Sequence, residues 1–194
     1  MRLPFEEETV LERRALLATL DAMSDRQFES GRTLCEGWAP RDVLAHVMGV
    51  ENVTTFVRQG LRINAANDRM VRDGRRWSRA ALMTAARDWV EQPSLAARVL
   101  AGGLFGDLVI HHQDILRGAG ITRALRPAAA RAVFREGVIW SWPFGRKLLH
   151  HRVVPTDGLV RPLGRGREVS GTTEALAMWL GGRPSVEQEL VFAG

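Results

Sequence analysis

Residues 104–117, LFGDLVIHHQDILR, form the stretch of sequence that decides the fold. The segment is strongly apolar and is followed by Gly118 and Gly120, and glycine is the residue that most often ends a helix. It therefore predicts a buried helix over this range. Asp107 and His111 stand four residues apart within it, so their side chains share one face of that helix, one turn apart.

Other segments with apolar residues at helical spacing predict that this helix belongs to a bundle. They lie at residues 4–23, at residues 40–58, from residue 78 onward and at residues 127–142. His46 lies inside the second of these helices, between apolar neighbours. Helices with one apolar face bury it against one another, so we expect four principal helices around one core, with the helix from Pro127 as a connecting helix.

The sequence pattern changes after Lys147. Short segments at residues 152–156, 159–163 and 167–170 alternate with glycine-containing turns and predict a small antiparallel meander, followed by a helix at residues 172–180. We therefore expect a mainly α protein, with a helical bundle at residues 1–147 and a small α+β subdomain at residues 148–194. About fifty residues lie near the lower limit of independent stability, so the subdomain is expected to pack on the bundle.

Composition excludes several classes of protein. The chain has 194 residues, of which 45% are hydrophobic and 25% are charged, as in an ordinary globular domain. No stretch approaches the roughly 18 apolar residues of a membrane span. The single cysteine, Cys35, cannot close an intrachain disulfide. We expect a cytoplasmic protein with no membrane association.

The basic charge does not by itself indicate nucleic-acid binding. The net charge is +5, and of the 27 basic residues all but Lys147 are arginine. These arginines are spread among acidic residues along the chain, which is typical of a solvated surface. We therefore expect small-molecule partners rather than nucleic acid, and either a monomer or a homodimer.

Three side chains are candidate ligands of a divalent metal ion: His46, Asp107 and His111. If their helices face each other in the bundle, two imidazoles and a carboxylate converge and leave an open position, as in catalytic metal sites. Zinc is the first candidate metal, with nickel or iron as alternatives. Taken singly, Asp107 could instead interact with the helix dipole, and each histidine could be a surface or hydrogen-bonded core residue.

Neighbouring polar residues are assigned supporting roles. His112 points about 100° away from His111 on a helix, so it is expected outside the ligand set, beside a ligand or at the surface. Asp114 could hydrogen-bond to His111 or pair with Arg117. Cys35 is interpreted as a small buried hydrophobic residue rather than a nucleophile. His150 and His151 are expected not to be ligands, whereas Arg76, Arg79 or Arg183 could hold an anionic substrate.

Two segments carry a resemblance to a known family. Residues 35–46, CEGWAPRDVLAH, and residues 106–114, GDLVIHHQD, resemble the two signature segments of the actinobacterial mycothiol-dependent maleylpyruvate isomerase family. Parts of residues 155–190 resemble the short C-terminal subdomain of that family. The resemblance implies a DinB-like four-helix bundle. It also implies that His46, Asp107 and His111 occupy the metal-ligand positions, with aspartate where the well-characterised isomerases of the family carry glutamate.

The resemblance also implies a function. The chain is expected to be a metal-dependent thiol S-transferase or isomerase that acts on a small electrophile through a metal-bound thiolate, with mycothiol or another small thiol as cosubstrate. A thiol that binds a divalent metal ion reacts as thiolate near neutral pH. Two alternatives remain open: a metal-dependent hydrolase with Asp114 as general base, and a metal-binding or ligand-binding protein without turnover.

Overall fold

The helix around Asp107 is α8, Ala101–Gly118. It ends where the backbone of another segment comes close, because a Cβ on Gly118 would lie 2.2 Å from the carbonyl oxygen of Arg32. Only glycine allows this approach, so the end of α8 lies directly against the loop that precedes α3 (Pro40–Gly49). The computed structural model describes residues 5–58, 62–92, 95–99, 101–142 and 145–193, and residue 4, the first residue of the predicted first helix, lies outside them.

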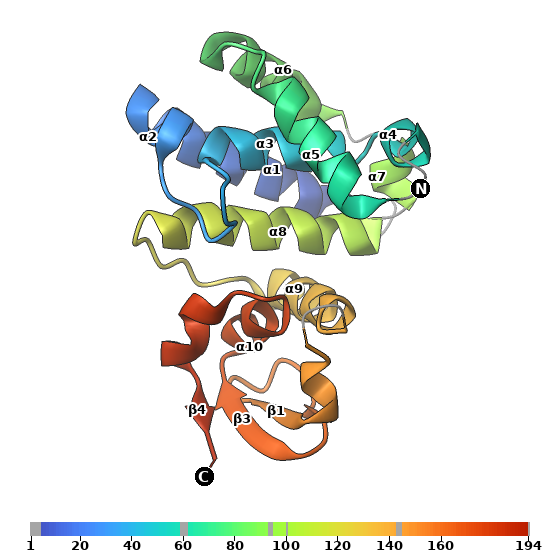
Figure 1. Cartoon of the computed structure of the whole chain (residues 1–194), viewed down its shortest axis with the longest axis vertical. Coiled ribbons are helices and arrows are strands. Elements are labelled where there is room, and N and C mark those ends of the chain that lie inside the picture. The colour runs from blue at the N-terminus through green and yellow to red at the C-terminus, as the bar shows by residue number, and fades with distance from the viewer. Residues whose placement is uncertain (1–4, 59–61, 93–94, 100, 143–144, 194) are drawn as a thin grey trace. The chain divides into compact units, whose positions relative to one another are not determined.

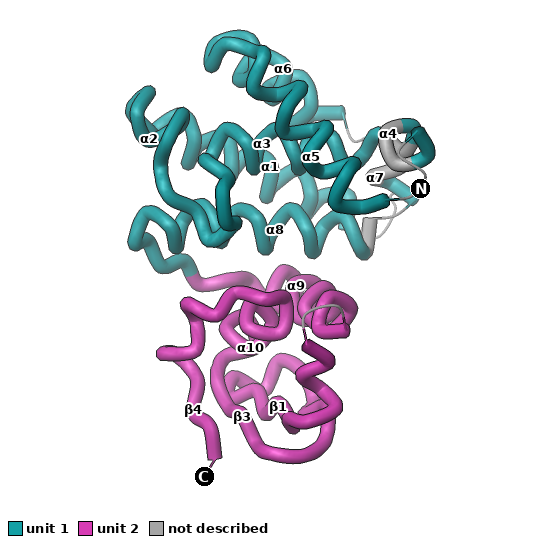
Figure 2. The backbone as a smooth tube through the Cα atoms, in the orientation of Figure 1, with its two compact units in different colours: residues 1–123 teal, residues 124–194 magenta. Residues whose placement is uncertain are grey.

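The first compact unit, Met1–Arg123, is built from helices (Figures 1 and 2). Its core is formed by α1, α3, α6 and α8, and α5 packs against α3. The elements are α1 (Glu6–Asp21), α2 (Asp25–Ser30), α3 (Pro40–Gly49), α4 (Val53–Arg58), α5 (Ile63–Gly74), α6 (Arg79–Glu91), α7 (Leu95–Val99) and α8. Buried residues on all four core helices, among them Leu16, Leu44, Leu82 and Ile115, fill the space between them.

The predicted second helix is interrupted, which corrects its expected extent of residues 40–58. The helix α3 ends at Gly49, where a Cβ would lie 2.7 Å from Cγ of Met70 on α5. The side chain of Asn52 then accepts hydrogen bonds from the backbone N–H and the hydroxyl of Thr54, at 3.2 and 2.5 Å, in the first turn of α4. Asparagine in this position starts a new helix instead of continuing the old one.

The second compact unit, Ala124–Gly194, begins earlier than predicted. It contains α9, Pro127–Trp140, which the sequence analysis assigned to the bundle of residues 1–147. Gly137 of α9 lies against α10, Thr173–Leu180, so closely that a Cβ on it would be 2.3 Å from the carbonyl oxygen of Ala177. The close packing of these two helices groups α9 with the C-terminal residues and moves the boundary from residue 147 to residue 123.

The sheet of the second unit is not the predicted antiparallel meander. Its strand order is β2-β1-β3-β4, where β1 (His151–Pro155) pairs in parallel with β3 (Arg167–Gly171). The two-residue strands β2 (Leu163–Gly164) and β4 (Val191–Phe192) add to its edges in antiparallel orientation. Asp157 accepts hydrogen bonds from the backbone N–H and hydroxyl of Thr173, at 2.9 and 2.6 Å. Asp157 follows β1 and Thr173 follows β3, so these contacts hold the carboxyl ends of the two strands side by side. Strands whose carboxyl ends lie together run parallel.

The predicted fold class is confirmed: the chain is mainly helical, with a small C-terminal sheet. The two short 3₁₀ helices, η1 (Lys147–Leu149) and η2 (Pro184–Glu189), flank elements of this sheet. Within the described residues, no helix combines the length and the apolar character that crossing a bilayer requires.

Candidate metal centre

His46, Asp107 and His111 converge between α3 and α8. His46 Nε2 lies 3.6 Å from Asp107 Oδ2, and His111 Nε2 lies 3.4 Å from Asp107 Oδ1. One potential ligand atom from each residue lies within 4.8 Å of the others. The two imidazole centroids are 4.7 Å apart with the rings nearly perpendicular. The structure therefore brings together the three side chains that the sequence singled out.

The local sequence explains how the two helices present these groups. Pro40 begins α3, and the Asp42 side chain accepts a hydrogen bond from the backbone N–H of Ala39 at 3.1 Å, which fixes the first turn. His46 follows within the same short helix and is 3% exposed. On α8 the four-residue spacing places Asp107 and His111 one above the other.

The arrangement fits a divalent cation. Asp107 Oδ2 is buried and accepts no hydrogen bond from any described residue. Its distance to His46 Nε2 is too long for a hydrogen bond, but donor atoms around a tetrahedral zinc ion lie about 3.3 Å apart. A buried carboxylate oxygen without a hydrogen bond is costly unless it is paired or bound to a metal. Two imidazole nitrogens and a carboxylate oxygen are ligands that suit zinc, iron and nickel.

Charge interactions within the centre favour the ionised carboxylate. Burial raises the pKa of Asp107, but the adjacent His111 and His46 lower it by more, so that it lies far below its ordinary value. Burial lowers the pKa of His111, and negative charge at Cys35 and Asp107 outweighs that effect and raises it well above its ordinary value. The site thus concentrates negative charge around His111, which a bound cation would balance.

Asp114 contacts the ring nitrogen of His111 that faces away from Asp107. Its Oδ2 lies 3.0 Å from His111 Nδ1, and the Asp114 side chain is fully buried. An imidazole that donates its Nδ1 proton to a carboxylate keeps Nε2 available as a ligand and fixes the ring orientation. This contact is one of the roles expected for Asp114 from the sequence.

Cys35 is a neighbour that the sequence analysis did not place here. Its Sγ lies 3.4 Å from His111 Nδ1 and 3.1 Å from Asp114 Oδ2. The loop at residues 31–39 brings it to α8, where the backbone N–H of Leu34 donates to the Asp114 carbonyl oxygen at 3.1 Å. The one feature of the sequence that could have indicated this contact is that Cys35 begins the segment of residues 35–46, which ends at His46.

Trp38 forms an aromatic wall beside both histidines. Its ring centroid lies 5.0 Å from that of His46 and 6.1 Å from that of His111. A large apolar ring beside a polar centre limits access of water and strengthens the charge interactions within it.

His112 belongs to a different group of residues. It is 1% exposed and faces α1, where its Nδ1 lies 2.7 Å from Glu12 Oε1 and its Nε2 lies 2.8 Å from Thr19 Oγ1. Arg123 also donates to Glu12, at 2.7 Å. His112 therefore ties α8 to α1, and its hydrogen bonds go to residues other than the three candidate ligands.

The histidines expected not to be ligands lie in the second unit. His150 is exposed. His151 packs edge-on against Trp179, with ring centroids 5.2 Å apart. Within the described residues, neither belongs to a group that could hold a metal ion.

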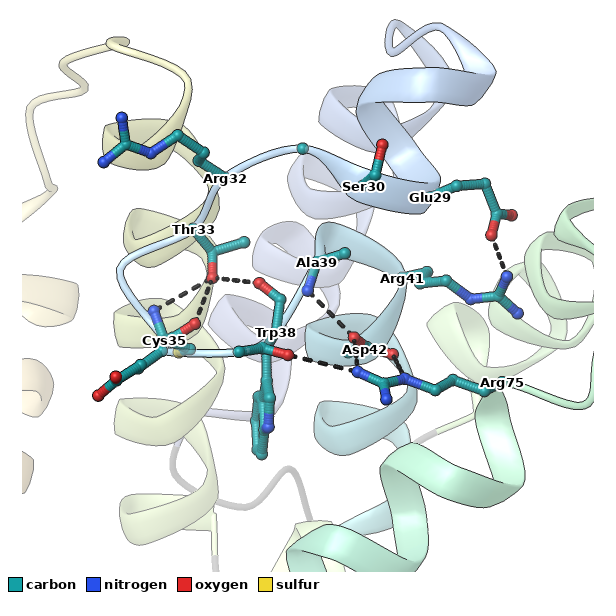
Figure 3. A pocket seen from close by; sticks show the side chains of 13 residues that line it. Glu29, Ser30, Arg32, Thr33, Cys35, Trp38, Ala39, Arg41, Asp42 and Arg75 are labelled. Atoms are coloured by element: carbon teal, nitrogen blue, oxygen red, sulfur yellow. Dashed lines mark hydrogen bonds and ion pairs between the residues drawn. The ribbon is translucent and has the colours of Figure 1, made fainter.

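A pocket of about 560 Å³ lies beside the centre, lined by the end of α2, parts of the loop before α3, the first turn of α3 and Arg75 (Figure 3). Two of the residues that line it, Cys35 and Trp38, also contact the candidate ligands. Arg75 donates to both carboxylate oxygens of Asp42, at 2.9 and 2.7 Å, so its charge is locally balanced. The pocket thus offers a small molecule both polar groups and an approach to the Cys35 side of the centre.

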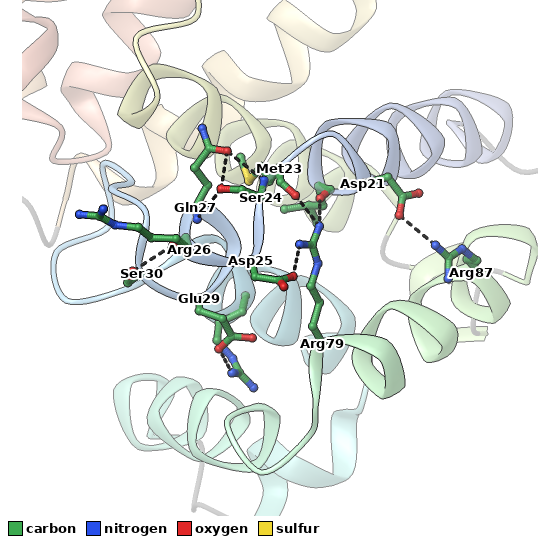
Figure 4. A network of polar contacts seen from close by, with 12 residues as sticks. Asp21, Met23, Ser24, Asp25, Arg26, Gln27, Glu29, Ser30, Arg79 and Arg87 are labelled. Atoms are coloured by element: carbon green, nitrogen blue, oxygen red, sulfur yellow. Dashed lines mark hydrogen bonds and ion pairs between the residues drawn. The ribbon is translucent and has the colours of Figure 1, made fainter.

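The arginines proposed from the sequence as anion ligands have other contacts. Arg79 donates to Asp25 at 2.6 Å and to the carbonyl oxygens of Leu20 and Met23, at 3.0 and 2.7 Å (Figure 4). Arg76 pairs with Asp73 at the surface, and Arg183 lies in the second unit. The basic residues among the described pocket-lining residues are instead Arg32, Arg41 and Arg75.

Comparison with known proteins adds evidence at the level of the fold. No family model and no curated protein matches the sequence. Two solved structures do match the fold: the crystal structure of the mycothiol-dependent maleylpyruvate isomerase, with a TM-score of 0.58, and that of a histidine-to-alanine mutant, with a TM-score of 0.64. The chain has the maleylpyruvate isomerase fold. Each match is 15% identical and covers 96% of this chain and 92% of the other. Membership of the family stays a prediction from the sequence.

Proposed function

We propose that this protein is a cytoplasmic, metal-dependent enzyme that adds or transfers a small thiol, such as mycothiol, to a small electrophile. Addition followed by bond rotation and elimination of the thiol would instead give an isomerase. Zinc is the metal that we expect, held by His46, Asp107 and His111. The observation that carries the proposal is the convergence of these three side chains on one centre within a fold shared with a mycothiol-dependent isomerase.

The chain's own residues would prepare the site for this chemistry. A divalent ion held there would lower the pKa of a thiol that binds it, so that the thiol reacts as thiolate near neutral pH. Asp114 orients His111 through its Nδ1, 3.0 Å away. Trp38 covers the imidazoles and limits water. The adjoining pocket of about 560 Å³ has the size of a small-molecule site.

The contacts of Asp114 favour thiol chemistry over hydrolysis. A hydrolase would need a general base within reach of a water molecule, and Asp114 was the only candidate for that role. In the structure its Oδ2 contacts both His111 and Cys35 and its side chain is fully buried. A carboxylate engaged in this way orients its neighbours and is poorly placed to accept a proton from water.

Removal and restoration of the metal test the proposal. Metal-free protein should lose thiol-dependent activity towards a panel of electrophiles and regain it when zinc is added. The thiols to compare are mycothiol, glutathione, bacillithiol and cysteine. His46→Ala should be inactive with all of them, whereas His150→Ala, which changes an exposed histidine of the second unit, should keep activity.

Cobalt spectroscopy tests whether the thiol reaches the metal. The experiment should use cobalt-substituted Cys35→Ser, because Cys35 is the chain's only cysteine and its own sulfur would otherwise contribute to the spectrum. Adding mycothiol should produce a sulfur-to-cobalt charge-transfer band. An unchanged spectrum at saturating thiol would refute the mechanism and leave a non-catalytic metal site or hydrolysis.

A further inference from the structure

His111 lies between two carboxylates, one at each ring nitrogen. Its Nε2 faces Asp107 Oδ1 at 3.4 Å, and its Nδ1 faces Asp114 Oδ2 at 3.0 Å. The Sγ of Cys35 completes a second cluster on the Nδ1 side, 3.4 Å from the nitrogen and 3.1 Å from the carboxylate oxygen. The same imidazole therefore takes part in two groups of potential ligands.

The spacing within this second cluster is close to that of a metal site. Around a tetrahedral zinc ion with one sulfur ligand, donor atoms lie about 3.3 to 3.6 Å apart. The three distances of 3.0, 3.1 and 3.4 Å are a few tenths of an ångström shorter. A cation that replaces the shared protons would need only small side-chain movements to reach its normal bond lengths.

We propose that Cys35, His111 and Asp114 form a second position for a thiophilic divalent cation such as zinc or cadmium. A thiolate ligand favours soft metals over hard ones, which distinguishes this position from the set of two histidines and one aspartate. The Asp114 side chain is fully buried. Cys35 lines the pocket of about 560 Å³, so an ion could reach the site through this pocket and bind a fourth ligand from it.

The two positions are alternatives because they share one imidazole. A neutral histidine binds a metal through one nitrogen and keeps its proton on the other. With the ion on Nε2, the Nδ1 proton is donated to Asp114. With the ion on Nδ1, the Nε2 proton is donated to Asp107. Each carboxylate is thus a ligand in one state and orients the ring in the other, as carboxylates beside metal-bound histidines commonly do.

The proton balance of binding is simple. The Cys35 thiol loses its proton to solvent when its sulfur binds the ion. His111 binds the ion as a neutral imidazole, so a proton on its Nδ1 also passes to solvent, while its remaining proton stays on Nε2 and the two carboxylates stay ionised. No oxidant or reductant is required. A consequence is that excess thiophilic metal withdraws His111 from the first position.

This inference is independent of the proposed thiol chemistry, so the two can fail separately. The test uses a full-length variant, His46→Ala with Asp107→Asn, that lacks the first position but keeps a hydrogen-bond acceptor for His111 Nε2. Cobalt(II) is the probe. This variant should bind one cobalt per chain and show a sulfur-to-cobalt charge-transfer band in the near ultraviolet.

Adding Cys35→Ser to this variant is the matched control. The band should disappear and the affinity should fall by more than the roughly 10- to 100-fold lost when a residue outside a ligand set is removed. If far-ultraviolet circular dichroism shows that the double variant is unfolded, the single variant Asp107→Asn replaces it with the same expectations. Absence of bound cobalt, or bound cobalt without the band, would overturn the proposal.

Discussion

Arg13 is a buried cation whose position depends on one carboxylate. It is 0% exposed, and its guanidinium forms an ion pair with Glu51, donates to the Trp89 carbonyl oxygen and lies 4.0 Å from the Trp89 ring centroid. Trp89 Nε1 donates to the same Glu51 oxygen at 3.0 Å. These contacts join α1, α6 and the segment that follows α3.

Glu51→Ala should therefore be strongly destabilising. Removing one partner of a buried ion pair leaves an uncompensated charge, which costs about 3 to 5 kcal/mol of unfolding free energy. The exposed pair of Arg14 and Glu91 provides the control, because both side chains are 56% exposed. Glu91→Ala should cost about 1 kcal/mol or less. Urea denaturation measures both, and equal losses would contradict this account of Arg13.

Asp157 links β1 to α10 in the second unit. Burial raises its pKa, but hydrogen bonds from Thr173 and from the backbone of Leu159 lower it by more, so its pKa lies below the ordinary value. The charged form is therefore stabilised by folding. This contribution is present above the ordinary carboxyl pKa of about 3.9 and is lost as the pH falls.

Asp157→Ala should destabilise the protein by about 1 kcal/mol at pH 7, the usual net contribution of a hydrogen bond such as those that Asp157 accepts from Thr173. Because the wild-type carboxylate becomes protonated in acid, the difference between wild type and variant should shrink as the pH is lowered towards 3. Denaturant unfolding at a series of pH values measures this difference. A difference that grew at low pH would be inconsistent with the sign of the pKa shift.

Site residues could be predicted from sequence where their relation is local. Asp107 and His111 share a face because the helix repeat requires it, and His46 was marked by its apolar neighbours. Cys35 could not be placed, because its contact with His111 depends on how the loop at residues 31–39 folds onto α8. A contact across many residues leaves no periodic trace in the sequence.

At the scale of elements, close backbone packing decides how α9 and α10 associate. A Cβ on Gly137 would lie 2.3 Å from the Ala177 carbonyl oxygen and 2.8 Å from its Cα, so the two backbones are nearly in contact. Neither neighbour is a flexible side-chain end. The two helices would have to separate to admit a methyl group.

Gly137→Ala should destabilise the second unit by about 1 to 3 kcal/mol, the usual cost of overpacking. Gly103 of α8 is the matched control, since a Cβ there meets nothing within 4 Å. Gly103→Ala should be neutral or stabilising by up to about 1 kcal/mol, because alanine favours a helix more than glycine. Thermal and urea unfolding compare them. Equal behaviour of the two variants would contradict the close packing of α9 on α10.

The elements themselves were only partly predictable. Helical periodicity predicted the core helices, because their apolar faces recur with the helix repeat. It missed the break after Gly49, where Met70 packs closely against the end of α3 and Asn52 accepts hydrogen bonds from Thr54 in the first turn of α4. It also missed the parallel pairing of β1 with β3, since strand direction depends on the contact of Asp157 with Thr173.

At the scale of the whole molecule, the prediction of a mainly helical protein with a small C-terminal sheet is confirmed, and the division between its parts is corrected. The boundary after Arg123 assigns α9 to the second unit. Sequence periodicity cannot make that assignment, because a helix with one apolar face can pack against the core of either unit. All three candidate ligands lie in the first unit.

The central claim is that the first unit holds one divalent ion through His46, Asp107 and His111. Metal analysis of protein purified without chelator or nickel resin tests it most directly. Wild type and His150→Ala should each contain close to one zinc per chain. His111→Ala should contain only traces, because this imidazole contributes to both clusters of potential ligands. A wild-type protein that cannot be loaded with metal, or a His111→Ala variant that retains one ion per chain, would contradict the account.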